Sequence, residues 1–313
     1  MSEKRVTMKD IAKEAGVSTA TVSYVLNYSN KEKISHETRM KIFETAHRLK
    51  YVPNMNARSL ASQRSLLVGI IINMETKNKK SKIYQYYDLA REIQRALYPM
   101  GYDILLMPTK EMKKDVAVGQ KRSLDAVFIL DMDEENFKLI ANQFYVPAIF
   151  IDGYVEDPIF CKIVTDYERV MERASELLEE NFYVVLEDYS NKKIYECILK
   201  YCSPEHIFIN YYEANLIEFL QKHHDQKGLV IGEILGMQVE NYVDNRNIAV
   251  VVGAESDVML LPDTKRIVVS NREKATCAVE IMLELLQINI AEEVERVSYI
   301  GPKDNQRRGN RDF

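Results

Sequence analysis

The sequence predicts a small all-α head followed by an α/β body with parallel, doubly wound sheets. Charge and periodicity change at the same place. Residues 1–65 hold 12 Lys/Arg and 6 Asp/Glu, whereas the remainder holds 30 and 41. Up to residue 65 apolar residues recur at helical spacing, and beyond it apolar runs of strand length alternate with amphipathic stretches. A chain of 313 residues, 46% of them hydrophobic, can bury the core of such a body and still carry a head.

The head begins with two short helices. Thr7 to Asp10 is a helix start signal, and Gly16 permits a tight turn after the first helix. Ser18 is placed to cap a second helix, whose inward face includes Val22. Two helices across a glycine-containing turn predict a helix-turn-helix.

A third helix is predicted from about residue 35 to 50 and completes the head. Pro53 follows it, and proline cannot continue a helix. The predicted organisation is therefore a headpiece at 1–52, a hinge helix and linker at 53–64, a two-lobed domain at 65–302 and a polar tail at 303–313. A hinge helix of about two turns is marginal alone, so we expect it to order only against DNA or a partner subunit.

The body shows ten strand candidates separated by helices. The strands are Leu66–Ile72, Tyr102–Met107, Ala126–Leu130, Ala148–Ile151, Lys162–Val164, Tyr183–Leu186, His206–Ile209, Leu229–Ile231, Ile248–Val252 and Ile267–Val269. The helices are Tyr84–Met100, Tyr167–Glu180, Leu216–His224 and Arg272–Gln287. Strand-helix alternation predicts parallel sheets, and this many strands suit two lobes facing each other across a cleft.

Several functional classes lack their motifs. We find no P-loop, dinucleotide glycine fingerprint, nucleophile elbow, HExxH motif or CxxC pair, so we expect no enzyme, metal or cofactor. The four cysteines are interpreted as small buried hydrophobes, and His223 and His224 as a solvated helix face. No leader or membrane-length apolar run is present, so we expect a cytoplasmic location.

Two stretches resemble the lactose-repressor (LacI/GalR) family of bacterial transcriptional regulators. Val6–Asn27 reads VTMKDIAKEAGVSTATVSYVLN, and Tyr51–Leu60 reads YVPNMNARSL at the distance where that family has its hinge. The resemblance implies a periplasmic-binding-protein-like body and a homodimer. It also implies that a near-palindromic operator is read in the major groove, with paired hinge helices in the minor groove.

The resemblance assigns roles to residues of the head. Thr19, Ala20 and Tyr24 match base-reading positions, although Tyr24 replaces an arginine common there, so the operator bases are not transferable. Matches to phosphate contacts are Thr7, Ser18, Thr21, Ser23, Asn27, Lys33 and Ser35. For Thr7 and Ser18, helix capping alone is the alternative.

The hinge residues match minor-groove contacts. Leu60 corresponds to the family's wedge leucine, which enters the base stack, with Asn54, Ala57 and Arg58 beside it. A leucine on a short amphipathic helix is ordinarily core, but little core lies within reach here.

The effector pocket departs from the family pattern. Asp166, Lys193 and Glu255 are the candidates, and capping a helix is the alternative for Asp166. The usual pocket arginine has only Lys192 or Lys193 nearby, the asparagine-aspartate pair lacks a match at Gly232-Glu233, and an aspartate is replaced by Glu255.

These departures leave two interpretations of the regulator. The first is a repressor of carbohydrate-related genes gated by a sugar-like effector. The alternative is a regulator that ignores effectors or needs a protein corepressor, for which the residues 84–95 offer only an amphipathic helix. A free sugar-binding protein lacks the basic head, and a nucleoid protein would show no sequence preference.

Overall fold

The computed structural model describes residues 6–26, 34–49, 51, 64–73, 79–109, 124–132, 146–153, 160–179, 181–286 and 296–303. The chain forms two compact units, the headpiece at residues 1–63 and the body at 64–313. The predicted hinge residues, together with Asn27 and Lys33, lie outside the described residues. Within the described parts, no helix has both the length and the apolar character to cross a membrane.

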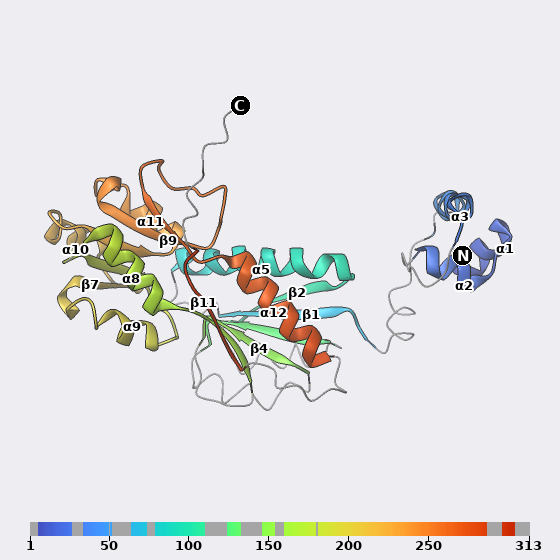
Figure 1. Cartoon of the computed structure of the whole chain (residues 1–313), viewed down its shortest axis with the longest axis horizontal. Helices are drawn as coiled ribbons and strands as arrows, with labels where there is room; N and C mark the ends of the chain where they lie inside the picture. Colours follow the sequence, from blue (N-terminus) through green and yellow to red (C-terminus); the bar gives the residue numbers. More distant parts are fainter. Residues whose placement is uncertain are drawn as a thin grey trace. The chain divides into compact units, whose positions relative to one another are not determined.

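The headpiece contains α1 (Met8–Ala15), α2 (Thr19–Leu26) and α3 (His36–Arg48) (Figure 1). The Asp10 carboxylate accepts hydrogen bonds from the amide and the hydroxyl of Thr7, which starts α1. Gly16 ends that helix with φ +68°, a conformation that costs glycine little, so the chain turns sharply into α2. The three helices share a core of Ile11, Ala12, Ala15, Val22, Val25, Ile42 and Ala46.

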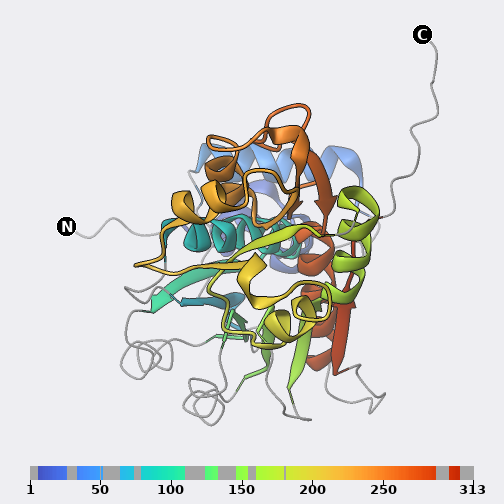
Figure 2. The ribbon, with the colours of Figure 1, turned by 90° about the vertical axis from the view of Figure 1, so that its left-hand side faces the viewer.

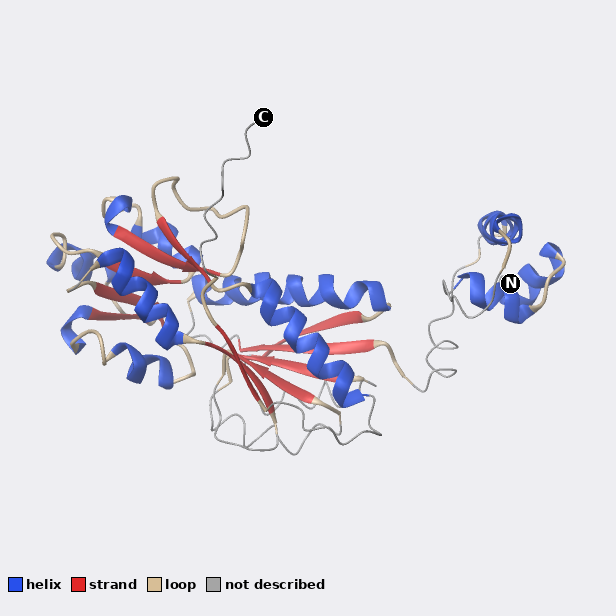
Figure 3. Cartoon of the chain, in the orientation of Figure 1, coloured by secondary structure: helices blue, strands red, loops and turns tan. Residues whose placement is uncertain are grey.

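The body contains two parallel sheets, which we call lobe 1 and lobe 2 (Figure 3). Lobe 1 has the strand order β11-β5-β4-β3-β1-β2, and lobe 2 has the order β10-β9-β8-β6-β7. The strands of lobe 1 are β1 (Leu67–Asn73), β2 (Asp103–Thr109), β3 (Ala126–Leu130), β4 (Ala148–Ile151), β5 (Cys161–Thr165) and β11 (Val297–Ile300). Those of lobe 2 are β6 (Tyr183–Glu187), β7 (Ile207–Asn210), β8 (Gly228–Ile231), β9 (Ile248–Val252) and β10 (Lys265–Val268). The predicted fold class is therefore confirmed.

Helices cover the sheets because strand residues alternate between two apolar clusters. In lobe 1, α5 (Lys80–Leu97) and α12 (Asn271–Leu286) pack together on one face. Figure 2 shows α12 and β11, both red, side by side. In lobe 2, α8 (Tyr167–Leu178) and α9 (Lys193–Ile198) lie on one face, and α10 (Leu216–Lys222) and α11 (Glu233–Val239) lie on the other. Three short turns, η1 (Tyr98–Met100), η2 (Pro204–His206) and η3 (Asn245–Asn247), complete the described elements.

The chain passes between the lobes at three places. It enters lobe 2 between β5 and α8, returns between β10 and α12, and leaves β11 toward lobe 2 again. At the third crossing, the amide of Lys303 donates to the carbonyl of Val268, and its ammonium bonds Glu255. Lys303, the first residue of the predicted tail, is thus held against the body, and the rest of that tail lies outside the described residues.

Some sequence expectations were wrong in detail. The helix expected from Tyr84 begins four residues earlier, at Lys80, and the sequence did not predict α9, α11 or β11. His223 does not belong to a solvated face, because it is 5% exposed and its ring lies 4.3 Å from that of Phe219. Three cysteines are buried as expected, whereas Cys277 is partly exposed.

Candidate nucleic-acid interface and effector cavity

The second helix of the headpiece presents an exposed face opposite its buried one. Val22 and Val25 are completely buried, whereas Thr19 and Ala20 are exposed and Tyr24 is half-buried. At 3.6 residues per turn, Thr19, Ala20 and Tyr24 fall within an arc of about 140° on α2 that excludes both valines, with Thr19 at the edge nearest Val22. The described structure therefore brings the three predicted base-reading residues onto one face, and their contacts with DNA stay a prediction.

Among the described residues predicted to contact phosphate, Thr7, Ser18 and Ser35 directly precede helices, Thr21 lies in the first turn of α2, and Ser23 lies in its middle. The Ser18 hydroxyl accepts from the amide of Thr21 at 3.0 Å, and the Ser35 hydroxyl accepts from the amide of Thr38 at 3.2 Å. Both serines cap helices, and the Thr7 hydroxyl donates to Asp10. Capping is thus present at these residues, and it leaves the exposed hydroxyls at helix N-termini, where backbone amides favour anions.

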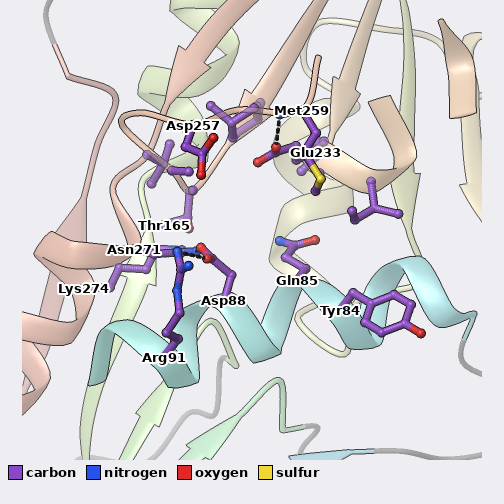
Figure 4. A pocket seen from close by; sticks show the side chains of 18 of the residues that line it. Tyr84, Gln85, Asp88, Arg91, Thr165, Glu233, Asp257, Met259, Asn271 and Lys274 are labelled. Atoms are coloured by element: carbon purple, nitrogen blue, oxygen red, sulfur yellow. Dashed lines mark hydrogen bonds and ion pairs between the residues drawn. The ribbon is translucent and has the colours of Figure 1, made fainter. Parts of the chain in front are cut away.

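A cavity of about 570 Å³ lies between the two lobes. Its walls come from α5 and α12 of lobe 1 and from the loops after β8 and β9 of lobe 2. In Figure 4, Asp88 and Arg91 rise from α5 toward Asn271, while Glu233 and Asp257 face them from lobe 2. Its size falls within the range of small-molecule sites.

Several polar groups that line this cavity are paired. Asp88 accepts from the Arg91 guanidinium and from the Asn271 amide, both at 2.8 Å. Glu233 accepts from the amide of Met259 at 2.7 Å. The walls therefore offer hydrogen-bonding groups at fixed positions beside apolar surface.

None of the three predicted effector residues lines that cavity. Asp166 caps α8 by accepting from the amide of Arg169, and Lys193 begins α9 with its side chain exposed. Glu255 accepts from the Ser270 hydroxyl at 2.5 Å and from Lys303 at 2.6 Å, and these bonds lower its carboxyl pKa, that from Lys303 most. Their contact with an effector stays a prediction.

Sequence reasoning missed the charged residues that are buried at the lobe junction. Lys82 pairs with Asp131 at 2.6 Å, and Lys274 pairs with Asp152 at 2.5 Å. Both aspartates follow strands of lobe 1 directly, and that position was a usable signal, because ligands of α/β sheets bind beyond the carboxyl ends of strands. Among the described residues, no cluster of His, Cys, Asp or Glu is arranged to hold a metal ion.

Burial also perturbs several groups around this junction. It raises the pKa of Tyr86, Tyr167 and Tyr189 well above the usual tyrosine value. Burial likewise raises the pKa of Glu187, although a hydrogen bond from Asn210 opposes the shift. The junction is thus a low-dielectric environment in which a charge requires a partner.

Known proteins match both the headpiece and the body of this chain. Residues 7–54 match the family model for bacterial regulatory proteins of the lacI family. Catabolite control protein A of Staphylococcus epidermidis is 32% identical over 196 residues, which are 60% of this chain and 57% of that protein. The sucrose operon repressor of Klebsiella pneumoniae is 30% identical over 173 residues, 53% of this chain and 49% of that protein. The chain thus spans about half the length of the curated relatives it matches.

Solved structures share the fold over nearly the whole chain. The lac repressor dimer bound to operator and the anti-inducer ONPF matches with a TM-score of 0.68 and 20% identity, covering 96% of this chain and 97% of that one. A CelR-cellobiose complex matches with a TM-score of 0.57 and 15% identity, covering 96% and 98%. Residues 7–54 thus match the lacI family of bacterial regulatory proteins, and the chain as a whole shares the fold of these solved structures.

Proposed function

We propose that this protein is a sequence-specific DNA-binding transcriptional regulator that represses carbohydrate-related genes. The headpiece carries the proposal, because its capped second helix exposes Thr19, Ala20 and Tyr24 on one face. A helix of this kind fits the major groove, where side chains distinguish all four base pairs. Curated relatives with matching sequence are a sucrose operon repressor and a catabolite control protein.

We further propose that the regulator binds a near-palindromic operator as a homodimer. The body exposes tyrosine side chains, a type enriched in interfaces, on α5 and in the loop after β7. Outside the cavity between the lobes, Tyr87 of α5 is 38% exposed, and Tyr211 and Tyr212, which follow β7, are 51% and 73% exposed. A twofold arrangement of two headpieces demands twofold symmetry in the DNA.

For regulation, the cavity between the lobes supports a small polar effector of sugar-like size. It provides carboxylate, guanidinium and amide groups beside apolar walls, a combination that suits a hydroxylated molecule. The second candidate is a regulator that ignores effectors or uses a protein corepressor. The buried ion pair between Lys82 and Asp131 favours this second candidate, because two charged side chains of the protein itself fill the junction between the lobes.

Selection of bound DNA from a random library by the purified full chain, at fixed salt, tests the proposal. We expect enrichment of one near-palindrome, and no enrichment would refute sequence-specific binding. Adding cell-extract metabolites separates the two candidates for regulation, because enrichment changes only in an effector-gated regulator.

A substitution on the reading face makes the test specific to the headpiece. Tyr24→Arg should change the selected bases, because arginine grips guanine with two parallel hydrogen bonds. Tyr98→Arg is the matched control, since Tyr98 is 74% exposed in the body and the substitution adds the same charge. Equal base preferences in wild type and Tyr24→Arg would remove Tyr24 from the interface.

A further inference from the structure

The topology of the two lobes identifies where a ligand between them would be held. In lobe 1 the strand order reverses between β1 and β3, and in lobe 2 it reverses between β6 and β8. Ligands of doubly wound sheets bind beyond the carboxyl ends of strands at such a reversal. Asp131 follows β3 directly and Asp188 follows β6 directly, so these two residues mark the expected position in each lobe.

One lysine occupies this position in the described structure. Lys82, in the first turn of α5, is 2% exposed, and its ammonium pairs with the fully buried Asp131 at 2.6 Å. The same ammonium donates to the carbonyl of Asp188 in lobe 2 and lies 5.9 Å from the ring centre of Tyr189. Lys82 therefore bonds both lobes at once.

The carboxylate of Asp131 also connects the two lobes. Its second oxygen accepts from the amide of Ser190 in lobe 2 at 2.8 Å. Beside it, the Tyr189 hydroxyl donates to Gln85 of α5 at 2.9 Å. The large cavity lies next to these contacts, since its lining includes Gln85 but neither Lys82 nor Asp131.

Burial of this ion pair depends on the lobes being together. A buried charge is tolerated only when it is paired and hydrogen-bonded, and here lobe 2 supplies a carbonyl to the ammonium and an amide to the carboxylate. If the lobes separated, both charges would lose those partners and gain water in their place. The buried ion pair therefore stabilises the arrangement in which the two lobes are together.

We propose that Lys82 takes the place of a ligand and closes the two lobes without a small molecule. We call Lys82, Asp131, Ser190, Tyr189 and Gln85 the inter-lobe clasp. Its regulatory consequence rests on the proposed function: the body is closed before any molecule enters the neighbouring cavity, so closure does not signal an effector. Regulation then acts on an already closed body.

Hydrogen exchange of the full chain, without added metabolites, tests the clasp at the Ser190 amide. We expect slow exchange in the wild type. In Lys82→Ala we expect exchange about ten- to a hundredfold faster, because hydrogen bonds to charged groups are lost. Lys80→Ala is the matched control, since Lys80 is exposed on the same helical turn and its loss should leave exchange unchanged.

Chemical rescue tests the charge itself. Lys82→Ala removes a propylammonium group, so added propylammonium should restore slow exchange, whereas 1-propanol should not. If propylammonium and 1-propanol restored slow exchange equally, the effect would come from filling the volume of the deleted side chain. That result would overturn the role given to the charge. If Lys82→Ala does not fold, Tyr189→Phe replaces it as the test variant, because it removes only one hydroxyl. We expect the Ser190 amide to exchange about threefold faster in this variant, since one hydrogen bond is lost.

The outcomes separate the clasp from the proposed function. Fast exchange of Ser190 in the wild type, or unchanged exchange in a folded Lys82→Ala, overturns the clasp whatever DNA is bound. Absence of an enriched DNA sequence refutes the proposed function and leaves the exchange result standing.

Discussion

Removal of one buried side chain from the headpiece core should weaken operator binding without affecting the body. Ile42 of α3 is fully buried and packs in one cluster with Ile11, Val22 and Val25. Replacing a buried isoleucine by alanine costs about 2–5 kcal/mol. A unit of some 50 residues is typically stabilised by only about 3–8 kcal/mol, so Ile42→Ala should remove between about a quarter and all of the headpiece's stability.

Calorimetry and operator binding of the full chain measure this effect. The headpiece and the body are separate compact units, so we expect a lower transition temperature for the headpiece and an unchanged one for the body. Operator affinity should fall as the unfolded fraction of the headpiece rises, with every 1.4 kcal/mol or so changing the folding equilibrium about tenfold.

Two control variants calibrate the expectation. Ile42→Val deletes one methylene and should cost only about 0.5–1.5 kcal/mol. Lys41→Ala changes an exposed neighbour and should leave the headpiece stable. If Ile42→Ala cost no more than Ile42→Val, or if it shifted the body's transition instead, the headpiece core would not be the structural basis of DNA binding.

Three further predictions concern the cap, the hinge and the buried carboxyl. Ser18→Ala should destabilise the headpiece by about 1 kcal/mol, because the Thr21 amide loses its acceptor; equal melting of variant and wild type would contradict this. Leu60→Ala should weaken operator binding and reduce DNA bending in a gel-mobility assay, whereas an unchanged bend would remove the wedge role. The raised pKa of Glu187 means that its carboxyl favours the fold below the usual value of 4.5 and that this contribution is lost as pH rises through the folded-state pKa. Glu187→Gln should therefore show a smaller fall in unfolding free energy from about pH 4.5 to 7, and parallel profiles would refute the assignment.

The headpiece was the most predictable part because its signals are local. The start signal at Thr7, the glycine that ends the first helix and the cap at Ser18 each act within one helical turn. The apolar side chains at helical spacing are the ones that the structure buries. The exposed face of α2 followed directly, since it is the face opposite the buried one, whereas its predicted role in reading bases came from the resemblance to the family.

The helices and strands of the body that were not predicted show where local sequence patterns are insufficient. The segment 233–239 contains Gly236, a poor helix former, yet α11 exists because Gly236 lets the helix approach Val250 closely. The first turn of α5 was missed because Ser81 and Lys82 are polar, although both are buried. Strand β11 is short and partly exposed at the edge of its sheet, so it has little apolar signal.

The sequence by itself determined the headpiece, the α/β class of the body and the strands buried by continuous apolar runs, because those features depend on neighbours along the chain. Only the tertiary structure decided what occupies the junction between the lobes. Lys82 and Asp131 lie 49 positions apart, and the backbone groups that complete their bonds lie more than 50 positions further on. No local pattern distinguishes such a lysine from a solvated one, because its burial follows from the packing of two separate sheets.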